Sequence, residues 1–179
     1  IFLLSRELLL ELVEECMAHD RYSFRRNVLQ EKGKTLRFNG YVWDGFAARI
    51  NSVQAYYQRS MELLRPEIRS ELFCAQRPVY AKENDAASTY IDPDGECVNS
   101  LISDGCDIQG SVRNCVLFRG VRVEKGAHAE NCILFKDTVV KAGASIRCVI
   151  ADKNVEFGGD VAMAGHAQYP LVVEKNTKL

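Results

Sequence analysis

Residues 117–133 read LFRGVRVEKGAHAENCI, and they are followed by LFKDTVVKAGASIRCVI at 134–150 and ADKNVEFGGDVAMAGHA at 151–167. When the three segments are aligned, each apolar position recurs every 17 residues. Within a segment, apolar residues come in pairs two positions apart, as Val121 and Val123 do, and residues two apart in a β-strand face the same side. Such pairs do not fit the 3.6-residue period of an α-helix.

The repeat predicts a three-sided coil of short strands, with small residues at the corners and one continuous core inside. Successive coils would pair through their backbones at a spacing of about 4.8 Å. We expect about four coils, with Arg122, His128, Ser145 and Glu156 facing outward between the apolar pairs. The coil from Ile102 to Leu117 is two residues shorter than the others, which is common for the end repeat of a solenoid.

The residues before the repeat predict helices mixed with short strands. Ser5, Ser23 and Ser52 suit the N-cap position of three helices. Asn39-Gly40 is a hairpin signal, so we expect strands at 36–38 and 41–43. The third helix should end at Pro66, and its expected buried residues are Val53, Tyr56, Met61 and Leu64.

These elements divide the chain into three parts. Residues 1–73 form an α/β part, 74–96 form a linker ending in the turn sequence Asp92-Pro93-Asp94-Gly95, and 97–179 form an all-β solenoid whose tail contributes a closing strand at 171–173. The chain opens on the apolar run Ile1-Phe2-Leu3-Leu4 without an initiator Met. We therefore expect a fragment that begins at the end of a buried strand.

Composition excludes several classes of function. The 23 Lys and Arg residues nearly balance the 24 Asp and Glu residues, so we expect no binding to nucleic acid or to anionic lipid. No apolar run approaches the length of about 18 residues that a membrane span needs, and no signal peptide is evident. Seven cysteines without CxxC pairs indicate reduced thiols in a cytoplasmic protein.

Two features of the repeat suggest chemistry, and each has a simpler explanation. Cys115, Cys132 and Cys148 recur nearly once per coil, but one stacked column does not supply the four converging ligands of a zinc site, so we interpret them as small apolar fill. His128 faces outward, where solenoid acyltransferases place a general base, but its acidic neighbour Glu130 is not specific, and we interpret it as a surface histidine. We predict no metal ligands and no catalytic residues, since no Gly-rich phosphate loop, HExxH or GxSxG motif occurs.

Three arginines of the repeat form a further candidate site. Arg119, Arg122 and Arg147 are expected on the outer faces of adjacent coils, where guanidinium groups can bind a phosphorylated effector in bidentate fashion. Solvated or inter-domain ion pairing is the simpler alternative.

Two blocks of sequence carry a resemblance to a known family. They are GFAARINSV at 45–53, with SMELL at 60–64, and NSLISDGC at 99–106, with NCVL at 114–117. The first block is similar to the segment that closes the nucleotidyltransferase domain of bacterial glucose-1-phosphate adenylyltransferase (ADP-glucose pyrophosphorylase), and the second is similar to the start of that family's β-helix. The resemblance covers most of the chain and implies the α/β tail of a nucleotidyltransferase domain followed by a single-stranded, left-handed parallel β-helix of hexapeptide-like coils.

Two positions depart from the catalytic pattern of that family. Where the family has Gly-Tyr-Trp-Arg-Asp-Val-Gly-Thr, whose Asp helps to bind the catalytic Mg²⁺, this chain has Arg49 at the Asp, and a guanidinium group repels a cation. Asn27 stands at the Asp of the family's Phe-x-x-Asp-Ile-Ile-Pro. The loss of both carboxylates resembles the non-catalytic, D-type subunit of the enzyme, which implies that this chain is not catalytic by itself and holds no cofactor.

The resemblance also implies partners and a regulator. The expected partners are a catalytic subunit of the same enzyme or further copies of this chain, bound through the β-helix. A phosphorylated sugar is the expected effector, with Arg122 and Arg147 at positions where relatives carry arginines and Arg119 next to one, because Gly120 occupies the matching position. A catalytic sugar-nucleotide transferase with an altered metal site and an acyltransferase that uses His128 remain as alternative functions.

Overall fold

The computed structural model of the chain describes residues 1–81 and 85–179. The described residues form two units, Ile1–Asp44 and Gly45–Leu179. This division falls well before residue 73, where the sequence-based division placed the end of the α/β part. Residues 45–73 share a unit with the solenoid because a helix from this stretch packs against it.

The first unit is helical. Its elements are the α-helix α1 (Arg6–Ala18), the π-helical segment η1 (Phe24–Gln30) and the 3-10 turn η2 (Lys32–Lys34). Ser5 caps α1 as predicted, since its hydroxyl accepts a hydrogen bond from the Leu8 amide at 3.3 Å. Leu12 is the buried residue of α1.

The strands predicted in the first unit are wrong. Residues 36–38 and 41–43 form no strand, and the side chains of Tyr41 and Val42 are 86% and 78% exposed. A two-stranded hairpin is marginally stable unless one of its faces is buried, so the Asn39-Gly40 signal alone does not suffice. The expected strand end at 1–4 is also absent.

Two helices open the second unit. They are α2 (Val53–Glu62) and α3 (Pro66–Leu72). The Ser52 hydroxyl caps α2 by accepting a hydrogen bond from the Ala55 amide at 3.0 Å, as predicted. Helix α2 ends before Pro66, and the proline then occupies the first turn of α3. Backbone N–H groups in a first turn have no acceptor within the helix, so the missing N–H of proline costs no hydrogen bond there.

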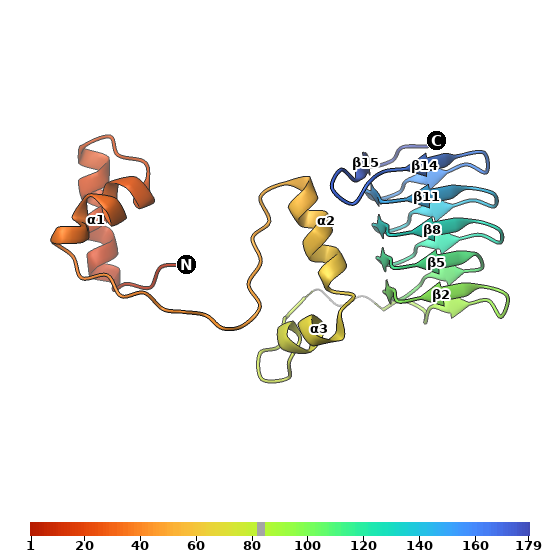
Figure 1. Cartoon of the computed structure of the whole chain (residues 1–179), viewed down its shortest axis with the longest axis horizontal. Coiled ribbons are helices and arrows are strands. Elements are labelled where there is room, and N and C mark those ends of the chain that lie inside the picture. Colours follow the sequence, from red (N-terminus) through yellow and green to blue (C-terminus); the bar gives the residue numbers. More distant parts are fainter. Residues whose placement is uncertain (82–84) are drawn as a thin grey trace. The chain divides into compact units, whose positions relative to one another are not determined.

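Residues 90–173 of the second unit form a parallel β-solenoid of five coils, which confirms the fold predicted from the repeat (Figure 1). Each coil contributes one strand to each of three sheets. Sheet A contains β1 (Tyr90–Ile91), β4 (Asp107–Ile108), β7 (Arg122–Val123), β10 (Val139–Val140) and β13 (Glu156–Phe157). Sheet B contains β2 (Glu96–Val98), β5 (Ser111–Arg113), β8 (His128–Glu130), β11 (Ser145–Arg147) and β14 (Ala162–Ala164). Sheet C contains β3 (Leu101–Ile102), β6 (Val116–Leu117), β9 (Ile133–Leu134), β12 (Val149–Ala151) and β15 (Leu171–Val173).

The register of the sheets reproduces the 17-residue repeat. Val123 pairs with Val140, and Val140 pairs with Phe157. Ile108 pairs with Val123, which is the predicted step that is two residues shorter. A further coil precedes it, because Ile91 of β1 pairs with Ile108. The solenoid therefore includes residues that we had assigned to the linker 74–96.

The corners depend on residues that tolerate a left-handed backbone. Asn and Gly adopt positive φ more readily than other residues. The corner between sheets B and C has positive φ at Asn99, Asn114, Asn131 and Cys148. The corner between sheets C and A has it at Gly105, Gly120, Asp137, Asn154 and Asn176. This recurrence lets each coil turn at the same place, so the strands stack in register.

The core lies inside the coils. Its largest fully buried side chain is Phe157, which stacks in register on the buried residues Ile108, Val123 and Val140. Among the described residues, no helix combines the length and the apolar character needed to cross a membrane.

Candidate interaction surfaces

Sheet C is apolar on both of its sides. Leu117, Leu134 and Ala151 belong to the core inside the coils, whereas their neighbours Ile133 and Ile150 belong to a second, external cluster. The outward column of sheet C reads Leu101, Val116, Ile133, Ile150 and Val172. An apolar column of this kind is stable when another element covers it.

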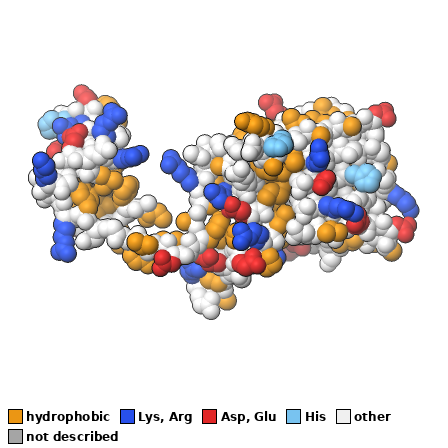
Figure 2. Space-filling model, in the orientation of Figure 1, with side chains coloured by type: hydrophobic (Ala, Val, Ile, Leu, Met, Phe, Trp, Pro, Cys, Tyr) orange, Lys and Arg blue, Asp and Glu red, His pale blue; other side chains and the backbone are white. Residues whose placement is uncertain are grey.

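Helix α2 covers the middle of this column, at Val116, Ile133 and Ile150, whereas Val172 at its end is exposed. Its Tyr57 is 3% exposed and forms a cluster with Ile133, Cys148 and Ile150, against which Tyr56 and Met61 also pack. Figure 2 shows hydrophobic side chains gathered between α2 and the strands of the solenoid. The helix and the solenoid are thus held together by a packed apolar contact.

Tyr57 anchors the helix with a polar contact as well. Its hydroxyl donates a 2.7 Å hydrogen bond to the backbone carbonyl of Asn131, across 74 residues of sequence. Burial, followed by the hydrogen bond with the Cys148 thiol, raises the pKa of Tyr57 well above its usual range. The phenol therefore remains a hydrogen-bond donor at any physiological pH.

An aromatic row extends the contact along sheet C. The rings of Tyr56 and Phe135 are stacked with centroids 6.3 Å apart, and those of Phe135 and Phe118 with centroids 4.6 Å apart. Offset aromatic pairs add about 0.5–1.5 kcal/mol each beyond the burial of their area. Phe118 at the end of the row is 37% exposed.

The three candidate arginines lie in different parts of the solenoid. Arg122 is exposed on β7 of sheet A, beside Asp107 in the register. Arg147 is exposed on β11 of sheet B, beside Glu130. Arg119 is half-buried at the corner that leads from sheet C to sheet A, where it lines a cavity of about 590 Å³ with Lys136 and Phe118. The prediction that these arginines face outward is confirmed for Arg122 and Arg147, but those two lie on different sheets.

The positions of the arginines within the repeat already predict that Arg122 and Arg147 lie on different sheets. Residues stack in one column only when they are one coil apart, as Arg113, Glu130 and Arg147 do. Arg122 instead stacks with Asp107 and Val139. The phase of each arginine within the 17-residue repeat is therefore sufficient to assign it to a sheet.

Arg49 lies where the resemblance places a magnesium ligand. It is exposed in the irregular segment before α2. In the described part of the chain, no group of three or more His, Cys, Asp or Glu residues is placed to hold a metal ion. A guanidinium group has no lone pair to offer a cation, so Arg49 itself does not fit the role of a Mg²⁺ ligand.

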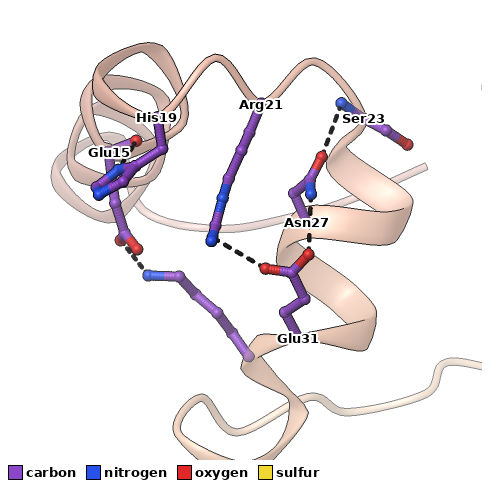
Figure 3. A network of polar contacts seen from close by, with 7 residues as sticks. Glu15, His19, Arg21, Ser23, Asn27 and Glu31 are labelled. Atoms are coloured by element: carbon purple, nitrogen blue, oxygen red, sulfur yellow. Dashed lines mark hydrogen bonds and ion pairs between the residues drawn. The ribbon is translucent and has the colours of Figure 1, made fainter.

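Asn27 takes part in a polar network instead (Figure 3). Its amide nitrogen donates to the Glu31 carboxylate at 2.9 Å, and its amide oxygen accepts from the Ser23 backbone at 3.3 Å. Arg21 pairs with Glu31 at 2.9 Å. Lys32 pairs with Glu15, and this hydrogen bond holds the pKa of Glu15 below its usual value. The Glu15–Lys32 pair connects α1 to η2, whereas the contacts of Asn27 join the two ends of η1, so the structure gives Asn27 a structural role there.

The cysteines fill the coils as expected, with one exception. Cys115 and Cys132 are fully buried and stacked, with the Cys132 amide donating to the Cys115 sulfur at 3.4 Å. Burial raises the pKa of the Cys132 thiol, which makes it unreactive. Cys148 departs from the column, because it occupies the corner position of Asn131 one coil further on, with φ at 51°.

His128 is exposed on sheet B, as predicted. Its register neighbours are Ser111 and Ser145. The nearby Glu96 carboxylate is engaged by Arg113 at 2.7 Å and by the Ser111 hydroxyl at 3.0 Å. This carboxylate is therefore held by other partners.

Sequence reasoning missed the contact between α2 and sheet C. The signal was present in adjacent apolar residues such as Ile133-Leu134 and Val149-Ile150-Ala151. A strand with one face in water alternates between apolar and polar residues, whereas a strand covered on both faces is apolar throughout. The partner helix does not follow from this pattern, since it lies far away in the sequence.

Comparison with known proteins gives two kinds of match. The family described as "GlmU-like, C-terminal hexapeptide" matches residues 86–166. The glycogen biosynthesis protein GlgD of Bacillus subtilis (strain 168) is 40% identical over 177 residues, which cover 98% of this chain and 51% of that protein. The glucose-1-phosphate adenylyltransferase of Acetivibrio thermocellus is 31% identical over 153 residues, which cover 82% of this chain and 34% of that enzyme.

A second GlgD, from Geobacillus stearothermophilus, is 34% identical over 127 residues, which cover 71% of this chain and 37% of that protein. The chain thus spans about half, or less, of the length of these relatives. The match that starts at residue 86 agrees with a solenoid that begins at β1.

Proposed function

Because this chain is homologous to the C-terminal region of the glycogen biosynthesis protein GlgD and of glucose-1-phosphate adenylyltransferases, we propose that it is the assembly and regulatory part of a subunit of that enzyme. The enzyme converts ATP and glucose 1-phosphate to ADP-glucose and diphosphate. In this proposal a catalytic partner performs the reaction, and the present chain supports it in the cytoplasm during glycogen biosynthesis.

The observation that carries the proposal is the exposed Arg49 in the segment that leads into α2. A guanidinium group has five N–H donors and no acceptor, so it cannot ligate Mg²⁺. Asn27 makes an acidic position of a second family motif neutral, and its side chain is hydrogen-bonded to Glu31 and to the Ser23 backbone. We therefore propose that this chain contributes no magnesium ligand at the position of Arg49.

The contact between α2 and sheet C supports the assembly role. The buried Tyr57 and its hydrogen bond to Asn131 join the segment before the solenoid to the solenoid itself. A partner bound to an outer face of the coils would thereby be coupled to residues 45–73. We propose that the coils wind left-handed, as in hexapeptide proteins, and that related subunits associate through the solenoid.

Effector binding is a further part of the proposal. We retain Arg119, Arg122 and Arg147 as candidate contacts for a phosphorylated sugar. Since Arg122 and Arg147 lie on different sheets, each would contact a separate phosphate group or act at a subunit boundary. Titration of the assembled enzyme with fructose 1,6-bisphosphate tests them, and unchanged activation of both Arg122→Ala and Arg147→Ala proteins would exclude these two residues.

The direct test of the proposed function is an assay of ADP-glucose formation with the full-length protein, alone and co-expressed with a catalytic subunit. We expect no formation by the protein alone, together with altered activity or effector response of the co-expressed complex. ADP-glucose formation by the protein alone at an ordinary enzyme rate would contradict the proposal. Magnesium-dependent binding of a sugar nucleotide by the protein alone would instead favour a catalytic subunit with an altered metal site.

A further inference from the structure

A cavity of about 520 Å³ lies between the α2–α3 junction and the corner of the solenoid where sheets B and C meet. One wall is formed by Asn99, Asn114 and Asn131, and the other includes Met61 and Arg65. This volume is within the range of small-molecule sites, about 300–1,000 Å³. Its lining includes neither Tyr57 nor any of the three candidate arginines, so the cavity is distinct from the surfaces described above.

The asparagine wall carries hydrogen-bonding capacity that the fold does not use. Asn99 donates its amide nitrogen to the amide oxygen of Asn114 at 2.7 Å. Each carboxamide has two donor hydrogens and one acceptor oxygen, so donors of Asn114 and an acceptor of Asn99 remain. Among the described residues, the side chain of Asn131 makes no hydrogen bond, since it is the backbone carbonyl that binds Tyr57. The result is a column of amides repeated at the coil spacing, about 4.8 Å.

The opposite wall is apolar with one charge of each sign. Met61, Leu64 and Pro66 supply carbon surface. Arg65 and Glu67 form a loose pair at 3.9 Å, with side chains 67% and 75% exposed. The carboxylate beside the arginine repels a phosphate group, so the charges do not select an anion.

We propose that this cavity binds a neutral saccharide. Each hydroxyl of a sugar is both donor and acceptor, which matches the amide column, and the C–H face of a sugar ring matches the carbon surface of Met61, Leu64 and Pro66. The inference itself rests on the cavity. The choice of an α-1,4-glucan as the first probe rests on the proposed function.

The corner geometry offers a matched control. Positive φ by itself explains why asparagines occur at these corners, and the same amide ladder recurs at the corner between sheets C and A, where Asn154 donates to Asn176 at 3.0 Å. That ladder does not line the cavity. Glycine keeps the left-handed backbone while it removes the side-chain amide. Asn114→Gly and Asn154→Gly are therefore the same kind of change, but only Asn114→Gly alters the lining of the cavity.

The experiment is a titration of the full-length protein with maltotriose, followed by ligand-observed NMR and calorimetry. We expect saturable binding that Asn114→Gly weakens about tenfold, which corresponds to roughly 1.4 kcal/mol, and that Asn154→Gly leaves unchanged. Arg65→Ala removes guanidinium donors from the opposite wall of the cavity, at an exposed side chain that forms no corner. It should therefore also weaken binding, and it guards against a folding defect in the glycine variant.

Three outcomes would overturn the proposal. They are the absence of saturable maltotriose binding, equal binding by the Asn114→Gly and Asn154→Gly proteins, and tighter binding of glucose 1-phosphate than of maltotriose in a manner that requires Arg65. Binding is measured on this subunit without a catalytic partner, whereas the proposed function is tested by ADP-glucose formation. A failure of saccharide binding would therefore not decide whether the proposed function is correct.

Discussion

The first unit and the solenoid differ in how far they bury their apolar residues. In the coils, side chains such as Leu134, Val140 and Phe157 are fully buried. In the first unit the buried hydrophobic residues among those described are Leu12 and Val28, and α1 leaves Val13 43% exposed. A coil encloses its own core, whereas an amphipathic helix buries its apolar stripe only against a second layer.

The largest expected effect is on stability, and it is tested by truncating one apolar side chain in each region. Leu134→Ala removes a fully buried side chain and should lower the free energy of unfolding of the solenoid by about 2–5 kcal/mol. Val13→Ala, at an exposed position of α1, should change stability by less than about 0.5 kcal/mol. Hydrogen exchange measured by mass spectrometry resolves the two regions. Equal losses of protection would show that the first unit has a core of its own.

The second prediction concerns the left-handed corners. Asn154→Ala places a Cβ-bearing residue that lacks a polar side chain at φ 58° and removes the 3.0 Å hydrogen bond to Asn176. It should destabilise the solenoid by about 1–2 kcal/mol. Asn154→Gly loses the same hydrogen bond but not the backbone compatibility, so it should cost less. Denaturant unfolding of the two variants separates these contributions, and an equal cost would assign the effect to the hydrogen bond.

The third prediction tests the anchor between α2 and sheet C. Tyr57→Phe keeps the ring but removes the donor to the Asn131 carbonyl, and should cost about 1 kcal/mol. Hydrogen exchange of the α2 amides is the measurement, and loss of protection should be confined to α2. Tyr80→Phe, at a side chain 91% exposed, serves as the control.

The same anchor makes the stability of this contact depend on alkaline pH. Burial raises the pKa of Tyr57 in the folded protein, whereas in the unfolded chain it is about 10. Below pH 10 both states are protonated and the contact is fully stable. Above it the unfolded state ionises first, so stability falls as the pH rises. Tyr57→Phe should remove this part of the pH dependence, and an unchanged alkaline profile would contradict the assignment.

Local periodicity and long-range packing explain what the sequence predicted and what it did not. The 17-residue step, its shorter variant and the caps at Ser5 and Ser52 follow from local rules, and the structure confirms them. The covering of sheet C by α2 depends on a contact between Tyr57 and Asn131, 74 residues apart, which no local pattern specifies. The hairpin predicted around Asn39-Gly40 failed for the related reason that a turn signal does not supply a packing partner.

The smallest expected effect lies in the first unit, at Asn27. Because its amide donates to Glu31 at 2.9 Å, Asn27→Asp would place two carboxylates four residues apart, where like charges destabilise a helix by about 0.5 kcal/mol or less. Hydrogen exchange of residues 6–31 should show reduced protection that added salt partly restores, while the solenoid is unaffected. Asn27→Ala, which removes the amide without adding charge, should lose protection with no such salt dependence. Increased protection in Asn27→Asp would mean that an acid is tolerated at this position, and the network would then no longer explain why the residue is neutral.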